Sequence, residues 1–140
     1  MRTRPKNPSE FRTIPVSLQY WKTVTLPFSD CLNYIGKTVT VMMDRPMGSK
    51  HPEHGYVYPI NYGYIPNTKA GDGEEQDAYV LGVFEPVDRI VAVCIAVIRR
   101  ANDVEEKLVV TPDGKQYTDD QIVALTEFQE RYFDSTVVRS

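Results

Sequence analysis

The stretch 90-IVAVCIAVI-98 is the longest near-continuous apolar run in this 140-residue chain. Nine residues are too few to cross a bilayer, and a short apolar run of this kind is typical of a strand buried on both faces. Four other segments are rich in β-branched or aromatic residues and are separated by Gly and Pro: 37–44, 56–65, 78–84 and 108–111. The sequence therefore predicts a mainly β protein with residues 90–98 as its central strand and no membrane segment.

One helix is expected after these strands. Thr118 and Gln121 have the spacing of a capping box, in which each side chain bonds the backbone of the other residue. Apolar residues then recur at the spacing of a helix packed on a sheet: Ile122, Leu125, Phe128 and Tyr132. Several short strands followed by one C-terminal helix indicate a partly closed barrel or a curved sheet covered by that helix, rather than a doubly wound βαβ fold.

The length and composition predict one globular domain with ordinary solubility. Prolines and weak periodicity in residues 1–33 predict an irregular N-terminal arm, and residues 34–140 are expected to form the domain. A net charge of −3 argues against nucleic acid as the main partner, because phosphate-backbone binding requires a concentrated basic face. No secretory pattern follows the basic N-terminus, and Cys94 lies inside the apolar run, so we expect a cytoplasmic protein without disulfides.

The segment 71-GDGEEQD-77 places four carboxylates between two predicted strands. A second acidic segment, 102-NDVEEK-107, follows the central strand. Converging carboxylates repel one another unless solvent or cations separate them, and hard oxygen ligands suit Mg²⁺ or Mn²⁺. The two segments therefore predict a shared metal site, although each also has the composition of a solvated hairpin turn.

The stretch 58-YPINYGYIPNT-68, followed after three residues by 72-DGEEQD-77, resembles the soluble family I inorganic pyrophosphatases. The resemblance is specific, because both motifs occur at the separation found in that family. It implies a small OB-like barrel over residues 34–140, a homo-oligomeric assembly, and Mg²⁺-dependent hydrolysis of pyrophosphate to two orthophosphates by a metal-activated water. Mn²⁺ is an alternative ion.

The resemblance also implies roles for individual residues. The metal ligands would be Asp72, Asp77 and Glu105, with Asp103 as a further ligand. Glu74 and Tyr58 would be catalytic, with Glu74 accepting a proton from the water and Tyr58 positioning the water or the carboxylates. The residues expected to bind phosphate oxygens are Arg45, Tyr62, Lys107 and Tyr132.

Two departures from the family pattern affect these expectations. Glu74 stands where the family usually has aspartate, and Phe133 stands where it has a lysine. The loss of a positive charge from the phosphate pocket leaves another phosphoanhydride, such as a nucleotide, as an alternative substrate. A non-catalytic OB-like module that stacks bases on the tyrosines of residues 56–64 is a second alternative, which the acidic loop disfavours because it would repel a nucleic-acid backbone.

Overall fold

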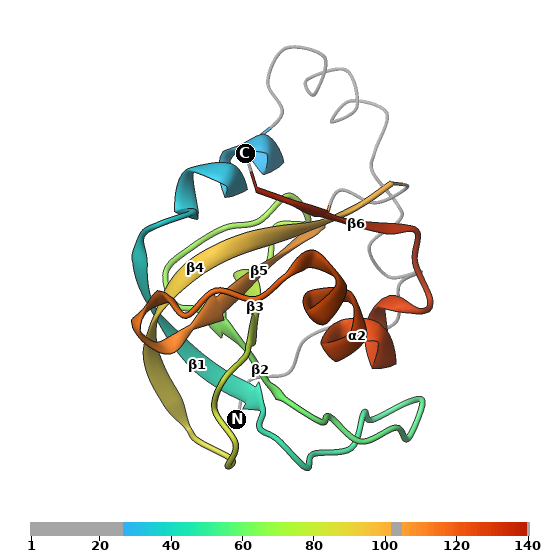
Figure 1. Ribbon diagram of the computed structural model, residues 1–140. Helices are drawn as coiled ribbons and strands as arrows, with labels where there is room; N and C mark the ends of the chain where they lie inside the picture. Colours follow the sequence, from blue (N-terminus) through green and yellow to red (C-terminus); the bar gives the residue numbers. More distant parts are fainter. Residues whose placement is uncertain (1–26, 102–104, 140) are drawn as a thin grey trace.

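A computed structural model describes residues 27–101 and 105–139 (Figure 1). Within these ranges the chain contains two 3₁₀ helices, six strands and one α-helix. The elements are, in chain order, η2 (Pro27–Tyr34), β1 (Thr38–Arg45), β2 (Asn61–Ile65), β3 (Gln76–Val80), β4 (Arg89–Arg100), β5 (Glu106–Thr111), η3 (Pro112–Gly114), α2 (Asp119–Glu130) and β6 (Ser135–Val138).

The strands form a closed mixed barrel with the order β1-β2-β3-β5-β4, because β1 also pairs with β4. All these pairings are antiparallel except the parallel pairing of β3 with β5. The short strand β6 pairs with β4 outside the ring. The predicted mainly β barrel with one helix packed on it is thereby confirmed, and closure leaves the five barrel strands without open edges.

The buried side chains of the barrel strands form two clusters, because successive side chains along each strand point to opposite faces of the sheet. On β3, Ala78 and Val80 pack in the cluster that contains Cys31 of η2, whereas Tyr79 packs in the cluster that contains Ile122 of α2. Figure 1 shows η2 and α2 on different sides of the barrel. The strands are therefore covered on both faces, as predicted for residues 90–98, and the face covered by α2 is the one that matters for the site.

The predicted segment 56–65 is only partly a strand. Pro59 has no amide hydrogen for a ladder, so regular pairing is confined to Asn61–Ile65, with a single bridge between Lys50 and Val57 before it. Within β2, Gly63 faces Met43 of β1 in a very close approach: a Cβ added to Gly63 would lie 2.0 Å from the carbonyl oxygen of Met42. The glycine of the motif is therefore required by strand packing.

Helix α2 begins with the predicted capping box, since the Thr118 hydroxyl accepts from the Gln121 amide and the Gln121 side chain accepts from the Thr118 amide. Its predicted apolar face is only partly correct, because Leu125 and the following Tyr132 are 36% and 52% exposed. The buried positions of the helix are Ile122, Thr126, Gln129 and Glu130. The helix thus turns polar side chains toward the barrel at its C-terminal end. No helix in the described part of the chain is long and apolar enough to span a membrane.

Candidate active site

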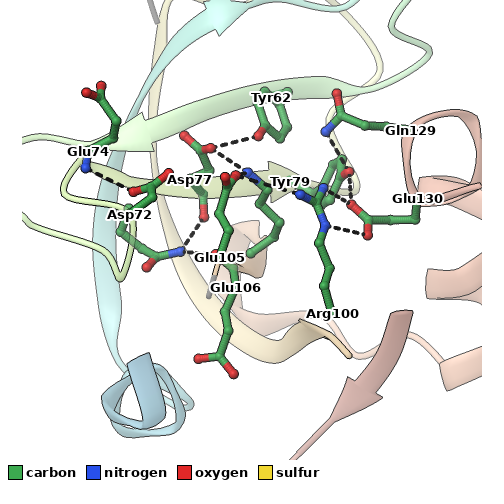
Figure 2. Close-up of polar contacts among 12 residues, drawn as sticks. Tyr62, Asp72, Glu74, Asp77, Tyr79, Arg100, Glu105, Glu106, Gln129 and Glu130 are labelled. Atoms are coloured by element: carbon green, nitrogen blue, oxygen red, sulfur yellow. Dashed lines mark hydrogen bonds and ion pairs between the residues drawn. The ribbon is translucent and has the colours of Figure 1, made fainter. Parts of the chain in front are cut away.

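Asp77, Glu105, Lys107 and Tyr62 form a buried polar group on the barrel face covered by α2, here termed the carboxylate centre (Figure 2). The parallel register of β3 and β5 pairs Ala78 with Leu108, which places the residues before them, Asp77 and Lys107, side by side. The Lys107 ammonium lies 2.6 Å from Asp77 Oδ2 and also forms an ion pair with Glu105.

Tyr62 completes the carboxylate centre from the neighbouring strand β2. Its hydroxyl donates to Asp77 Oδ2 at 2.9 Å, and the Lys107 ammonium lies 5.6 Å from the centre of its ring. Asp77, Glu105 and Lys107 are each at most 5% exposed. Two carboxylates held this close inside a protein require a cation, and the ammonium supplies one.

The acidic loop before β3 is a turn built around Asp72. The Glu74 amide donates to Asp72 Oδ1 at 2.9 Å, and Gly73 between them has a φ of +87°, which favours glycine. Figure 2 shows the Glu74 carboxylate directed away from Asp72 and Asp77. Asp72 and Glu74 therefore do not share in the hydrogen bonds of the carboxylate centre described above.

An arginine extends the carboxylate centre toward α2. Arg100, at the end of β4, lies with its Nη1 3.8 Å from Glu105 Oε1, and its other nitrogens bond both oxygens of Glu130 at 3.1 and 2.7 Å. Ser135 and Tyr79 also donate to the Glu130 carboxylate, at 2.5 and 2.6 Å. Burial alone would raise the pKa of Glu130, but the bonds and charge of Arg100, aided by Ser135 and Tyr79, hold that pKa below its ordinary value.

Gln129 connects three tyrosine hydroxyls on the same face. Its Oε1 accepts from Tyr58 at 2.8 Å and from Tyr56 at 2.9 Å, while its amide nitrogen donates to the Tyr79 hydroxyl at 2.8 Å. Burial, followed by the charge of Glu130, raises the pKa of Tyr79 well above the ordinary phenol value. The sequence predicts that Tyr58 positions a carboxylate or a water molecule. In this structure its hydroxyl donates to the side-chain amide oxygen of Gln129 on α2.

Two of the residues predicted to bind phosphate, Tyr132 and Tyr62, are connected by a row of aromatic rings. From Tyr132 the ring centres follow at 6.2 Å to Tyr56, then 5.6 Å to Tyr58 and 5.6 Å to Tyr62. Arg45 lies at the irregular end of β1, where its Nη1 donates to the Asp44 carbonyl oxygen at 2.8 Å. Asp103 lies outside the described residues.

Of the predicted site residues, the structure brings Asp77, Glu105, Lys107 and Tyr62 into direct contact. Sequence reasoning gave no role to Gln129, Glu130 or Tyr79. For the two arginines that end the central strand, alternation predicts that only one can face the site: Arg99 turns to Glu106 on the opposite face, so Arg100 is the one that faces the centre. No local pattern indicated that two polar residues at the end of α2 face inward.

The carboxylate oxygens of Asp72, Asp77 and Glu105 fit Mg²⁺ by their chemistry, since this ion prefers hard oxygen ligands. Within residues 27–101 and 105–139, no three acidic, His or Cys side chains are grouped closely enough to hold an ion together. Asp77 and Glu105 instead share the Lys107 ammonium. Asp77 and Glu105 therefore already bind a cation together, and this cation is the ammonium group of the protein's own Lys107.

Comparison with known proteins gives one consistent family. The family model described as inorganic pyrophosphatase matches residues 33–137. An inorganic pyrophosphatase of Campylobacter jejuni is 31% identical over 66% of this chain and 54% of its own length. One from Xanthomonas campestris is 35% identical over 44% of this chain and 36% of its own length. The chain thus spans about half, or less, of the curated relatives it matches.

Solved structures support the same fold. The inorganic pyrophosphatase of Ehrlichia chaffeensis aligns with a TM-score of 0.58 and 20% identity, covering 72% of this chain and 84% of that one. The inorganic pyrophosphatase of Neisseria gonorrhoeae aligns with a TM-score of 0.55 and 23% identity, covering 70% of this chain and 74% of that one. At these identities the likeness extends to the fold of the barrel alone.

Proposed function

Because this chain belongs to the inorganic pyrophosphatase family, we propose that it hydrolyses inorganic pyrophosphate to two orthophosphates with the help of Mg²⁺. Family membership confirms the resemblance carried by the motifs at residues 58–68 and 72–77. The observation that supports an active member best is the carboxylate centre, in which Asp77 and Glu105 converge on one cation from separate segments of the chain.

In the proposed mechanism, Asp72, Asp77 and Glu105 would hold the magnesium ion, with Asp103 as a further ligand and Mn²⁺ as a substitute ion. When bound, the ion would lower the pKa of a water molecule and neutralise charge on the phosphoryl groups. Glu74 would take a proton from the attacking water, which its partly exposed position on the loop permits. Its side chain is one methylene longer than the aspartate usual in the family.

The substrate side of the proposed site carries positive charge and hydroxyls. Arg45 would bind phosphate oxygens by its guanidinium fork and Lys107 as a point charge. Tyr62 and the half-exposed Tyr132 would donate hydroxyl hydrogen bonds, while Tyr58 would position its neighbours through the row of rings. Family resemblance also supports a homo-oligomer, which sedimentation equilibrium would measure.

The central experiment measures orthophosphate release from pyrophosphate with Mg²⁺ and then Mn²⁺. We expect Asp77→Asn to abolish release while the fold is kept, because asparagine can still accept from Tyr62 and the Lys107 ammonium keeps its ion pair with Glu105. Asp113→Asn is the matched control: Asp113 is exposed on η3, and asparagine tolerates its φ of +55°. Full magnesium-dependent turnover by Asp77→Asn would refute the assignment.

The role of Glu74 has its own test. We expect Glu74→Asp to keep or raise activity, and Glu74→Gln to lose it, because only the carboxylates can accept the proton. If Glu74→Asp is inactive while Glu74→Gln is active, Glu74 does not activate the water. A panel that adds nucleoside di- and triphosphates to the same assay tests whether another phosphoanhydride is preferred.

A further inference from the structure

The Lys107 ammonium is held where it competes with a divalent ion. It lies between Asp77 and Glu105, two of the carboxylates proposed to ligate magnesium, and its side chain is only 3% exposed. A divalent ion cannot use both carboxylates fully while the ammonium remains between them, because like charges at this distance in a buried site repel strongly.

Glu105 would keep its place if the ammonium left. Its Oε1 lies 3.8 Å from Arg100, and Arg100 is fixed by the two-pronged pairing with Glu130 on α2. Figure 2 shows this arrangement, with Arg100 and Glu130 extending from Glu105 toward the helix. On the other side, the Tyr62 hydroxyl donates to Asp77 at 2.9 Å in the phosphate-free protein. Both carboxylates thus have a second donor or cation that does not depend on Lys107.

A phosphate ligand would attract the ammonium away from these carboxylates. Lysine is a flexible point charge that can turn toward a new anion, whereas Arg100 is bound at both ends of its fork. Pyrophosphate carries several negative charges and would compete with Asp77 and Glu105 for the same ammonium.

From these contacts we propose that Lys107 is a built-in competitor of the metal ion, which couples the binding of the divalent ion to the binding of a phosphate ligand. Without phosphate, the ammonium occupies the carboxylates and weakens metal binding. With phosphate, the ammonium moves to the phosphate oxygens and frees the carboxylates. The coupling is reciprocal, so metal also tightens phosphate binding. This inference rests on the proposed function, because it takes the same carboxylates as metal ligands.

The test is the affinity for Mn²⁺ measured by calorimetry in the absence of any phosphate, with no turnover involved. We expect Lys107→Met to bind Mn²⁺ about 10-fold more tightly than the unmodified protein. Lys107→Arg, which keeps the positive charge, and Lys115→Met, a change of an exposed lysine on η3's C-terminal side, should not tighten binding. Equal or weaker Mn²⁺ binding by a folded Lys107→Met would overturn the proposal.

Lys107→Met leaves two buried carboxylates without their shared cation, so it will be less stable, and Mn²⁺ should raise its melting temperature more than that of the unmodified protein. If Lys107→Met does not fold even with Mn²⁺, the same calorimetry on the unmodified protein tests the proposal. We expect its Mn²⁺ affinity to rise about 10-fold when methylenediphosphonate is added. An unchanged affinity would overturn the coupling. Tight coupled binding without orthophosphate release would instead refute the proposed hydrolysis and leave this inference standing.

Discussion

The pairing of Glu130 with Arg100 predicts that Glu130→Gln is strongly destabilising, although it changes only one atom of the side chain. Each oxygen of Glu130 accepts two hydrogen bonds: Oε1 from Arg100 and Ser135, and Oε2 from Arg100 and Tyr79. Glutamine has one oxygen, so its NH₂ group must face two donors whichever way the amide turns.

The magnitude follows from what is lost. Two hydrogen bonds to a charged group would disappear, each contributing about 1.5–3 kcal/mol. The Arg100 guanidinium would also lose its nearest carboxylate while its side chain stays 3% exposed. Removing one partner of a buried ion pair costs about 3–5 kcal/mol, and we expect a decrease of that size in the free energy of unfolding. The total free energy of unfolding of a domain is about 5–15 kcal/mol, so this loss would be a large part of it.

Urea denaturation at neutral pH measures the change, and Glu127→Gln is the matched control. Glu127 lies one turn earlier on the same helix, where it pairs with Arg131, and both side chains are more than half exposed. Solvent screens such a pair, so the control should leave stability nearly unchanged. Equal, small losses in the two variants would refute the claim that Glu130 stabilises the buried network.

The pH dependence gives an independent check of the same reasoning. The folded pKa of Glu130 lies below the ordinary value of 4.5. Its contribution to stability is therefore complete above the unfolded pKa and is lost as the pH falls through the lowered folded pKa. The difference in the free energy of unfolding between the unmodified protein and Glu130→Gln should therefore decrease as the pH falls from the unfolded pKa of Glu130 through its lower folded pKa. A gap that stays constant would show that Glu130 is not held ionised by Arg100.

Three further predictions concern the barrel and its helix. Gly63→Ala should lower the free energy of unfolding by about 3 kcal/mol, because the new methyl group would overlap the Met42 carbonyl and force the strands apart, as urea denaturation would show. Thr118→Ala should cost about 1 kcal/mol in the same assay, since it removes the hydroxyl that caps α2. Cys31 and Cys94 should resist a thiol reagent at pH 8 until the protein unfolds, because both side chains are buried. Burial raises the pKa of both thiols, that of Cys94 to about 11, so little reactive thiolate is present at pH 8. Rapid labelling of the native protein would contradict this prediction.

Local signals in the sequence predicted the elements well. The apolar run at residues 90–98 became the central part of β4, and the Thr118 capping box begins α2 as expected. β6 was missed because four residues that pair only with β4 give too short a pattern to recognise. The predicted arm at 1–33 lies outside the described residues up to residue 26, and residues 27–34 form η2.

The two acidic segments and the family resemblance predicted part of the candidate site. Asp77 and Lys107 come from segments thirty residues apart, and their contact depends on the parallel pairing of β3 with β5, which no local pattern specifies. Glu130 and Gln129 were missed for a different reason. The helix was interpreted by its apolar spacing, which selected Leu125 and Tyr132, whereas the buried end of α2 is polar because it bonds Arg100 and the tyrosines.

One departure from the family pattern, Phe133, is connected to the site through Arg100. Phe133 stands where the family resemblance leads one to expect a lysine, and its ring lies 3.5 Å below the Arg100 guanidinium. A cation placed on an aromatic face is stabilised, and the ring also shields the ion pair with Glu130 from water. A lysine at this position would instead bring a second positive charge against the arginine. Phe133 therefore does more than remove a positive charge from the site. Its ring stabilises the Arg100 guanidinium, and this guanidinium is the fixed positive charge that β4 places beside Glu105.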